Sequence, residues 1–553
     1  MPESPTQTVE AHPRAPFATR SVVLARHGMV SAAQPLAVEA GVEVLRRGGS
    51  AVDAALAVNG CLAVMEPTAC GLGGDLFALV WEPKSRKLHG LNASGRSPRA
   101  LAIERLPGFE NGLIPLHSPY AWTVPGCVDG WCELRRRFGK LSMREILAPA
   151  IAYAREGFPV SRVIAEDWAR GVPVYRERPG FAEVFMPGGR APREGEVFSN
   201  LALARTLEAV AEGERDAFYA GPVAQVLVRY SHEHGGFFSR EDFALHLSTW
   251  DEPIHTTYRG VELWEMPPNG QGLAALEMLN LLENFDLASL GRESADYWHL
   301  LVEAKKVAFA DRARYYADPT FAEVPVEELL SKERARRGAS RIELGRAMQR
   351  EPADDLRLAR GETTCLSTAD GDGMMVSLIQ SHYTGFGSGY VVPSLGFGLQ
   401  SRGAQFSLDH RHPNALEPGK RPFHTIIPGF LTRDGEPYAA FAVMGADMQP
   451  QGQVQVVVNL VDLGLDLQEA GDAPRFHHGG SSEPTGAAMT AGGVLHLEPG
   501  VPPAVVGELA RRGHRIEPAR GVYGGYHAVA RDARSGVYAG ASESRKDGCA
   551  LGY

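Results

Sequence analysis

The chain has 553 residues, of which 44% are apolar and 22% are charged. This is the ordinary composition of a globular protein, with ample material for a large core. The formal net charge of -10 argues against nucleic-acid binding, since that needs a basic surface to neutralise phosphates.

The sequence contains no run of apolar residues long enough to predict a membrane-spanning helix. Its first residues lack the basic segment and apolar stretch that mark a secretory signal. The six cysteines are scattered without a CxxC pair, which argues against a zinc ribbon or a thioredoxin-like site. We therefore expect a cytoplasmic protein with reduced thiols.

The first part of the chain has mainly helical patterns. Residues 1–20 are rich in proline and polar residues and predict a flexible tail. Apolar residues recur at helical spacing over 36–45, Gly48 and Gly49 end that helix, and Ser50 is a favourable N-cap for the next. Further patterns predict strands within 71–83 and 87–101, a helix within 141–161, and mostly helix over 196–345.

The pattern changes at residue 363. Short strands follow, with a helix over 453–465 and a β-hairpin over 524–542. We therefore predict a helix-rich part, 21–362, and a strand-rich part, 363–553.

Several common kinds of site are not supported by the motifs. The glycine-rich stretches 70–77 and 385–389 lack the P-loop pattern and are interpreted as tight turns. His410, His412 and the pair His477–His478 lack the spacing of metal ligands, so no metal and no cofactor are predicted. No GxSxG nucleophile elbow occurs.

Two adjacent threonines, Thr363 and Thr364, stand where a polar segment meets a predicted strand. They could simply open the strand, because threonine favours strands. Alternatively, cleavage before Thr363 would free an α-amino group with a pKa of roughly 7.7–8.0 beside the hydroxyl. One residue would then supply both nucleophile and base.

The stretch "ETTCLSTADGDGMMVSLIQSHYTGFGSG" resembles the γ-glutamyltransferase (glutathione hydrolase) family of N-terminal nucleophile hydrolases. Further stretches resemble this family in the same order: "AGVEVLRRGGSAVDAALAV", "EPTACGLGGDLF", "ADRARYYADP", "GKRPFHTIIPGF", "EAGDAPRFHH" and "GASESRKDGCALGY". The resemblance covers nearly the whole chain.

The resemblance implies an α/β fold, a four-layer αββα sandwich, and a precursor that cuts itself between Glu362 and Thr363. The resulting large and small subunits would stay associated, and a homodimer of such heterodimers is one assembly it allows. Thr363 would be the nucleophile, supported by Thr364. Gly445 and Ala446 would form the oxyanion hole, although the family has two glycines there.

The resemblance also implies residues that bind substrate. Arg96, with Arg99 as the competing assignment, would bind an α-carboxylate through a bidentate guanidinium. Around the acyl group the sequence departs from the family pattern at Cys365, Ser381, Tyr383, Arg402, Gln405, His424 and Thr425. Of these, Ser381 is predicted to be catalytic, and the last five are predicted to bind substrate. Gln405 replaces an aspartate that pairs with the α-amino group of glutamate in the family, and a neutral amide cannot make that ion pair. The short link from Gln405 to Lys420 also suggests that no lid loop covers the site.

The leading hypothesis is a self-processing threonine amidohydrolase that cleaves γ-glutamyl amides such as glutathione, with hydrolysis favoured over transfer. A second hypothesis is an acylase for glutaryl- or oxamate-type amides, which carry no α-amino group. The departures around the acyl group resemble this divergent branch of the family and predict weaker selection for γ-glutamyl compounds than in members that degrade glutathione. A third is an unprocessed, non-catalytic binding protein. The expected partners are a small-molecule amide and the two subunits of one precursor, with no nucleic acid and no membrane.

Overall fold

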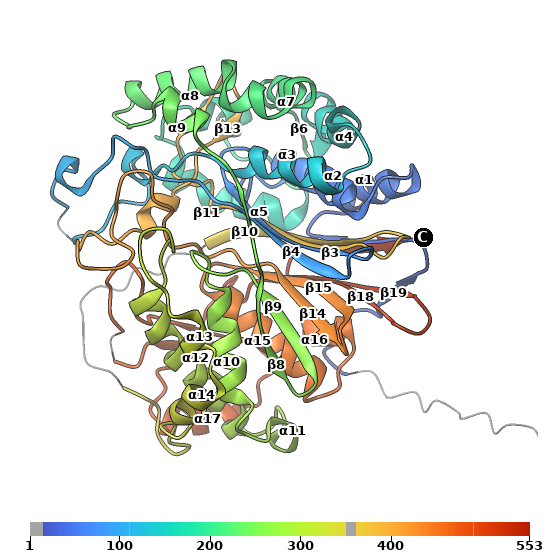
Figure 1. Ribbon diagram of the computed structural model, residues 1–553, viewed down its shortest axis with the longest axis vertical. Coiled ribbons are helices and arrows are strands. Elements are labelled where there is room, and N and C mark those ends of the chain that lie inside the picture. Colours follow the sequence, from blue (N-terminus) through green and yellow to red (C-terminus); the bar gives the residue numbers. More distant parts are fainter. Residues whose placement is uncertain (1–14, 110, 350–360, 490) are drawn as a thin grey trace, which may run out of the picture.

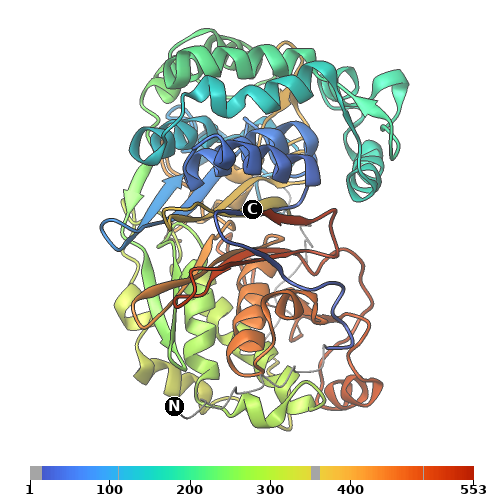
Figure 2. The same cartoon turned by 90° about the vertical axis from the view of Figure 1, so that its right-hand side faces the viewer.

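The computed structural model describes residues 15–109, 111–349, 361–489 and 491–553. Two β-sheets lie face to face between two layers of helices, as Figure 1 shows from one side and Figure 2 after a quarter turn. The predicted four-layer αββα sandwich is therefore confirmed.

One central sheet has seven strands in the order β20-β2-β10-β11-β3-β4-β7. All of its neighbouring strands are antiparallel. Its strands are β2 (Met29–Ala32), β3 (Asp75–Glu82), β4 (Lys87–Ala93), β7 (Thr249–Asp251), β10 (Gly361–Ala369), β11 (Met375–Thr384) and β20 (Cys549–Gly552).

The other central sheet also has seven strands, in the order β1-β19-β18-β15-β14-β9-β8. Its strands are β1 (Val23–Ala25), β8 (Ile254–Tyr258), β9 (Val261–Glu265), β14 (Gly429–Arg433), β15 (Glu436–Met444), β18 (Gly525–Arg531) and β19 (Tyr538–Ser542). Three small two-stranded sheets pair β5 (Phe158–Pro159) with β6 (Val197–Phe198), β12 (Val391–Val392) with β13 (Phe397–Gly398), and β16 (Phe476–Gly479) with β17 (Val494–Leu497).

The helices divide between the two outer layers (Figure 1). One layer holds α1 (Pro35–Arg46), α2 (Ala51–Met65), α3 (Cys127–Phe138), α4 (Met143–Glu156), α5 (Arg162–Tyr175), α6 (Phe181–Phe185), α7 (Leu201–Tyr219), α8 (Pro222–Glu233) and α9 (Arg240–Ala244). The other holds α10 (Gly272–Leu282), α11 (Leu287–Leu290), α12 (Ala295–Tyr315), α13 (Val326–Leu329), α14 (Lys332–Ala339), α15 (Met448–Val461), α16 (Leu467–Asp472) and α17 (Pro503–Arg511).

Strand β10 shows how the core is layered. Leu366 faces the α1–α9 layer, whereas Cys365 and Ala369 lie in the apolar layer between the two sheets. This follows from the two-residue period of a strand, which sends alternate side chains to opposite faces. Residues 363–369 of β10 are buried on both faces, and so the strand that contains Thr363 is packed on both sides.

The helical hairpin predicted from the early sequence is present as α1 and α2. The Ser50 hydroxyl accepts a hydrogen bond from the backbone N–H of Asp53, and the Asp53 carboxylate accepts one from the backbone N–H of Ser50. This reciprocal capping box satisfies two donors that a helix start leaves free. The helices predicted within 141–161 and 453–465 and the hairpin over 524–542 are also present.

The structure confirms that 196–345 is mostly helical, and it adds strands that were not predicted there. The strands β7, β8 and β9 lie within that range and extend both central sheets. Every second residue of β9 is buried, from Val261 to Glu265, which is the pattern of a half-buried strand. The part before residue 361 therefore contributes to both sheets.

The predicted flexible tail lies partly outside the described residues, which begin at Ala15. The backbone N–H of Ala15 donates to Glu469, and that of Thr19 donates to Asp472, both on α16. The described end of this segment is therefore anchored to the second helix layer. Among the described residues, no helix combines the length and the hydropathy needed to cross a bilayer.

Candidate active site

The pairing of β10 with β11 is irregular at Thr363. Glu362 pairs with Tyr383 and Thr364 pairs with Gln380, so Thr363 lies opposite two residues of β11. Tyr383 has a φ of 80°, a left-handed conformation that is costly for a bulky side chain. The peptide bond between Glu362 and Thr363 thus lies at a bulge, beside a strained residue.

Ser381 connects the groups around this bond. Its hydroxyl donates a hydrogen bond to the carbonyl oxygen of Glu362 at 2.9 Å. It accepts one from the Thr363 hydroxyl at 3.2 Å and one from the backbone N–H of Tyr383 at 2.7 Å. A hydroxyl has one donor and two acceptor positions, and all three are used here.

A cavity of about 310 Å³ opens beside Thr363. Its lining residues lie within segments 113–116, 362–363, 404–405, 444–447, 477–488 and 517–524, together with Tyr383, His496 and Lys546. Among the residues predicted from sequence, the cavity brings together Glu362, Thr363, Tyr383, Gln405, Gly445 and Ala446. This volume suits a small molecule.

Gly445 and Ala446 form a tight turn between β15 and α15. Both have positive φ, 120° at Gly445 and 49° at Ala446. Their backbone N–H groups donate no hydrogen bond within the described residues. Gln271 holds the turn in place: its side-chain amide donates to the carbonyl of Ala446 and accepts a hydrogen bond from Arg312. Two free N–H groups on a fixed turn can stabilise an oxyanion.

Two carboxyl groups on the cavity wall share one guanidinium. Arg312 is fully buried and binds Asp447 at 2.7 Å and Glu483 at 2.8 Å. Burial raises the pKa of Glu483, and the neighbouring Asp447 charge adds to this, although Arg312 opposes it. Burial also acts upward on Asp447, but Arg312 outweighs it and holds the pKa of Asp447 below its usual range. The sequence analysis missed these three residues, which come from distant segments; only the position of Asp447 after the oxyanion turn could have signalled one of them.

Glu66 lies beneath the site, next to Thr364. Both side chains are buried. Burial raises the pKa of Glu66 to about 7, although the Lys546 charge and the Thr364 hydroxyl oppose the shift. Lys546 lines the cavity and lies 3.7 Å from the Glu362 carboxylate. Sequence reasoning singled out neither residue, although both fall inside family-like stretches.

Arg402, Thr425 and His424, which were predicted as substrate contacts, do not line the cavity. The Arg402 guanidinium is fully buried, lies 4.6 Å from the centre of the Tyr383 ring and donates to the Thr425 hydroxyl at 2.7 Å. Its Nε and Nη2 atoms have no hydrogen-bond partner among the described residues. His424 donates instead to the buried Asp75 at 3.1 Å. Burial and the Arg402 charge lower the pKa of His424 to about 3, so its ring is neutral.

Arg96 is also held away from the cavity. Its guanidinium bonds to Asp318 and to the carbonyl of Gly419, both at 3.3 Å. The competing candidate, Arg99, is exposed and lies 3.8 Å from Glu241. Neither arginine lines the cavity, because a carboxylate elsewhere in the fold already pairs with each of them. Cys365 is likewise remote, buried in the layer between the sheets.

The histidines considered as metal ligands belong to no group of three or more possible ligands among the described residues. His410 is exposed, His412 donates to the carbonyl of Ala313, and His478 donates to that of Gly492. His477 lines the cavity, and burial lowers its pKa to about 3.

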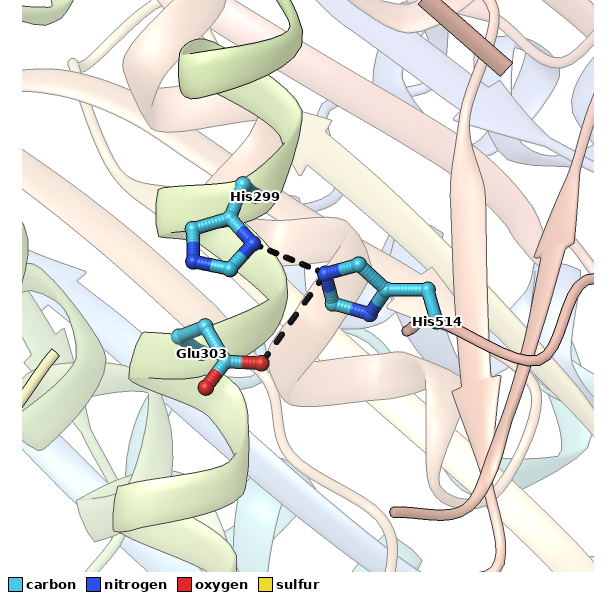
Figure 3. A group of neighbouring side chains, drawn as sticks. All are labelled: His299, Glu303 and His514. Carbon is cyan, nitrogen blue, oxygen red and sulfur yellow. Dashed lines mark hydrogen bonds and ion pairs between the residues drawn. The ribbon is translucent and has the colours of Figure 1, made fainter. Parts of the chain in front are cut away.

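A different group, His299, Glu303 and His514, comes close enough to hold a metal ion (Figure 3). The Lys306 ammonium group donates a hydrogen bond to the Glu303 carboxylate at 2.8 Å, and the rings of His299 and His514 are hydrogen-bonded to each other at 2.8 Å. His299 also bonds to the carbonyl of Glu343, and Glu303 accepts from the backbone N–H of Met348. A buried ammonium at the carboxylate disfavours a cation there, and the group instead anchors residues 343–348.

Comparison with known proteins identifies the family. The model of the gamma-glutamyltranspeptidase family matches residues 37–553. The chain belongs to this family. It is accordingly an enzyme of the N-terminal nucleophile hydrolase type, as the resemblance in its motifs predicted.

Its relatives differ in the activities for which they are named. The chain is 36% identical to the glutathione hydrolase-like YwrD proenzyme of Bacillus subtilis, over 96% of this chain and 99% of that protein. It is 34% identical to the oxamate amidohydrolase proenzyme of Klebsiella pneumoniae, over 95% of this chain and 98% of that protein. The crystal structure of cephalosporin acylase from Bacillus halodurans superposes with a TM-score of 0.89 at 42% identity, covering 99% of each chain.

Proposed function

We propose that the chain cuts itself before Thr363 and then hydrolyses amides through an acyl-enzyme on that threonine. The observation that carries the proposal is the Ser381 hydroxyl, which bridges the Thr363 hydroxyl and the Glu362 carbonyl oxygen. The nucleophile and the bond it would attack are thus connected through one residue. Relatives that are named proenzymes support such processing.

In the processing step, the Thr363 oxygen attacks the Glu362 carbonyl carbon while Ser381 polarises the carbonyl oxygen. The peptide C–N bond breaks, an ester to Thr363 forms, and the hydroxyl proton passes to the departing nitrogen. Water then hydrolyses the ester to release the Glu362 carboxylate. Thr363 is left with a free hydroxyl and a free α-amino group, and residues up to 362 become the large subunit.

In turnover, the free α-amino group of Thr363 acts as the base for its own hydroxyl. Its ordinary pKa of roughly 7.7–8.0 suits a base at neutral pH. The tetrahedral oxyanion would be held by the backbone N–H groups of Gly445 and Ala446, and each such donor contributes about 10²–10³ in rate. The leaving amine takes the proton, and water resolves the acyl-enzyme.

We propose γ-glutamyl amides of the glutathione type as the leading substrate class, with hydrolysis favoured over transfer. A relative named glutathione hydrolase-like supports this class. Water can reach the acyl-enzyme, because the partly exposed side chains of Glu517 and Lys546 lie on the cavity wall.

An acylase for amides without an α-amino group is the second candidate. Gln405 favours it, because this neutral side chain stands where the family pattern has a carboxylate. Its amide is already engaged by the Tyr383 hydroxyl. Relatives named oxamate amidohydrolase and cephalosporin acylase also support it.

Denaturing electrophoresis with N-terminal sequencing tests the proposal against a non-catalytic binding protein. We expect two fragments, one of which begins at Thr363. A persistent single chain of 59.7 kDa that turns over no amide would contradict it. We also propose that both subunits stay associated in a cytoplasmic enzyme; co-elution of the fragments and cell fractionation test these two points.

A further inference from the structure

The cavity contains two carboxyl groups for one guanidinium. Arg312 bonds both Asp447 and Glu483, and its own side chain is fully buried. The carboxyl groups are not: the Asp447 side chain is 33% exposed and that of Glu483 is 26% exposed, and both residues line the cavity. When both carboxyl groups are ionised, the cluster carries one net negative charge and can therefore accept one further positive charge from the ligand space.

Lys305 is another cationic side chain that acts on both carboxyl groups, but it forms no ion pair with either of them among the described residues. Lys305, about two helical turns before Arg312 on α12, bonds to Ser481 at 2.6 Å and to the carbonyl of His478 at 2.9 Å. Neither carboxylate lies within ion-pair distance of it among the described residues. Burial also lowers the pKa of Lys305 well below its ordinary value, which disfavours the charged form.

The cluster lies close to Gln405, the residue that cannot pair with an ammonium. The side-chain amide of Asn414 donates to the carbonyl of Gln405 at 2.7 Å and to that of Pro484 at 3.0 Å. This bridge fastens the segment that carries Glu483 to the segment that carries Gln405. The Gln405 amide donates to the Tyr383 hydroxyl. Burial raises the pKa of Tyr383, and the charges of Asp447 and Glu483 add to this shift.

We propose that Glu483, positioned with Asp447 on Arg312, binds the ammonium group of the acyl part of the substrate. The negative charge absent at position 405 is supplied from the neighbouring loop. The substrate class is then amides of amino-dicarboxylic acids, rather than amides of plain dicarboxylic acids. This inference rests on the proposed amidohydrolase function and decides between its two substrate candidates.

The chemistry is charge pairing and includes no covalent step. On binding, the ligand ammonium donates to the Glu483 carboxylate. Burial raises the pKa of Glu483, and the ammonium opposes that shift because it favours the charged carboxylate. An ionic hydrogen bond in a partly buried site contributes about 1.5–3 kcal/mol. Selectivity for an amino-bearing acyl group should therefore be about ten- to a hundredfold.

The test compares γ-glutamyl-p-nitroanilide with glutaryl-p-nitroanilide, which differ only in the α-amino group. Glu483→Gln keeps the shape and an oxygen that can accept from Arg312, but removes the charge. We expect kcat/KM for the γ-glutamyl substrate to fall about ten- to a hundredfold, with the glutaryl substrate changed less than about threefold. Glu483→Asp should recover part of the selectivity.

Glu517→Gln is the matched control, because Glu517 also lines the cavity but pairs with Arg515 at its rim. It should leave the substrate ratio unchanged. All variants are compared after the small subunit is verified to begin at Thr363.

An equal loss of kcat/KM on both substrates in Glu483→Gln would overturn the assignment. It would mean that Glu483 and Asp447 affect the reaction through the turn at Gly445 and Ala446 and not by binding the ammonium group. An unchanged ratio, or a loss confined to transfer onto an amino-acid acceptor, would also overturn it. If the processed wild-type protein cleaves neither anilide, the proposed function itself fails. Calorimetric binding of L-glutamate and glutarate then still tests whether Glu483 binds the ammonium group. The wild-type protein should bind L-glutamate more tightly than glutarate, and Glu483→Gln should not.

Discussion

The hydroxyl of Ser381 donates a hydrogen bond to the carbonyl oxygen of Glu362 and accepts one from the hydroxyl of Thr363. This places one side chain on both reactants of the proposed processing step. It also makes Tyr383 part of the arrangement, because the backbone N–H of Tyr383 donates to the same oxygen.

Replacing Ser381 by alanine should slow processing about a hundredfold, which is the usual effect of losing one donor to a developing oxyanion. The measurement is the time course of fragment appearance after purification of the precursor. Ser381→Thr keeps the hydroxyl and should process within about tenfold of wild type. Processing of Ser381→Ala at the wild-type rate would show that the Ser381 hydroxyl does not polarise the Glu362 carbonyl.

Thr363→Ala should abolish both chain cleavage and amide hydrolysis, because the residue supplies the oxygen for both reactions. Electrophoresis and p-nitroaniline release measure the two effects. Thr363→Ser keeps a hydroxyl and should retain partial processing. If fragments still form in Thr363→Ala, Thr363 is not the nucleophile of the processing step, and Thr364 becomes the candidate.

Ala446 adopts a φ of 49°, a conformation that costs an L-residue roughly 1–2 kcal/mol. Ala446→Gly removes this strain but adds chain entropy, so stability should change by less than about 1 kcal/mol. Activity should stay within about threefold, because the backbone N–H is retained. Ala446→Val should instead impair both the melting temperature and kcat; wild-type values in that variant would contradict a fixed left-handed turn.

Part of this site was predictable from sequence, because its residues lie within local motifs. Thr363 stands at a predicted strand start, and Gly445 and Ala446 lie in a contiguous stretch to which the family resemblance assigned the oxyanion hole. The pairing of Arg96 with Asp318 and of His424 with Asp75 was not predicted, because these buried partners lie far along the chain and have no spacing signature.

The fold shows the same division between local and long-range information. The helices α1 and α2 follow from helical periodicity and from the capping serine between them. The strands β8 and β9 were missed because each has only five residues, too few for a strong alternating pattern. Arg312 on α12 pairs with Asp447 at the start of α15 and with Glu483 in a loop. These three segments are far apart in the sequence, so the cluster could not be predicted from local patterns.

Gln405→Asp should raise turnover of γ-glutamyl-p-nitroanilide relative to glutaryl-p-nitroanilide. The new carboxylate would add a second negative group beside the ammonium site, and it would repel the glutaryl group, which carries only a carboxylate. The ratio of kcat/KM values should shift about tenfold. The control is Gln405→Asn, which keeps a neutral amide; an unchanged ratio in Gln405→Asp would show that position 405 does not contact the acyl group.

Glu66 should make the stability of the protein depend on pH. Its pKa rises from 4.5 to about 7 in the folded state, chiefly through burial, so the native protein holds a proton that the unfolded chain releases. The stabilisation is therefore complete below about pH 4.5 and is lost as the pH rises through 7, with a linkage effect on the order of 3 kcal/mol. Glu66→Gln cannot ionise and should gain melting temperature relative to wild type at pH 8 but not at pH 5. Thermal unfolding at the two pH values measures the difference, with Glu517→Gln as an exposed control; equal shifts at both pH values would mean that Glu66 is already ionised in the fold.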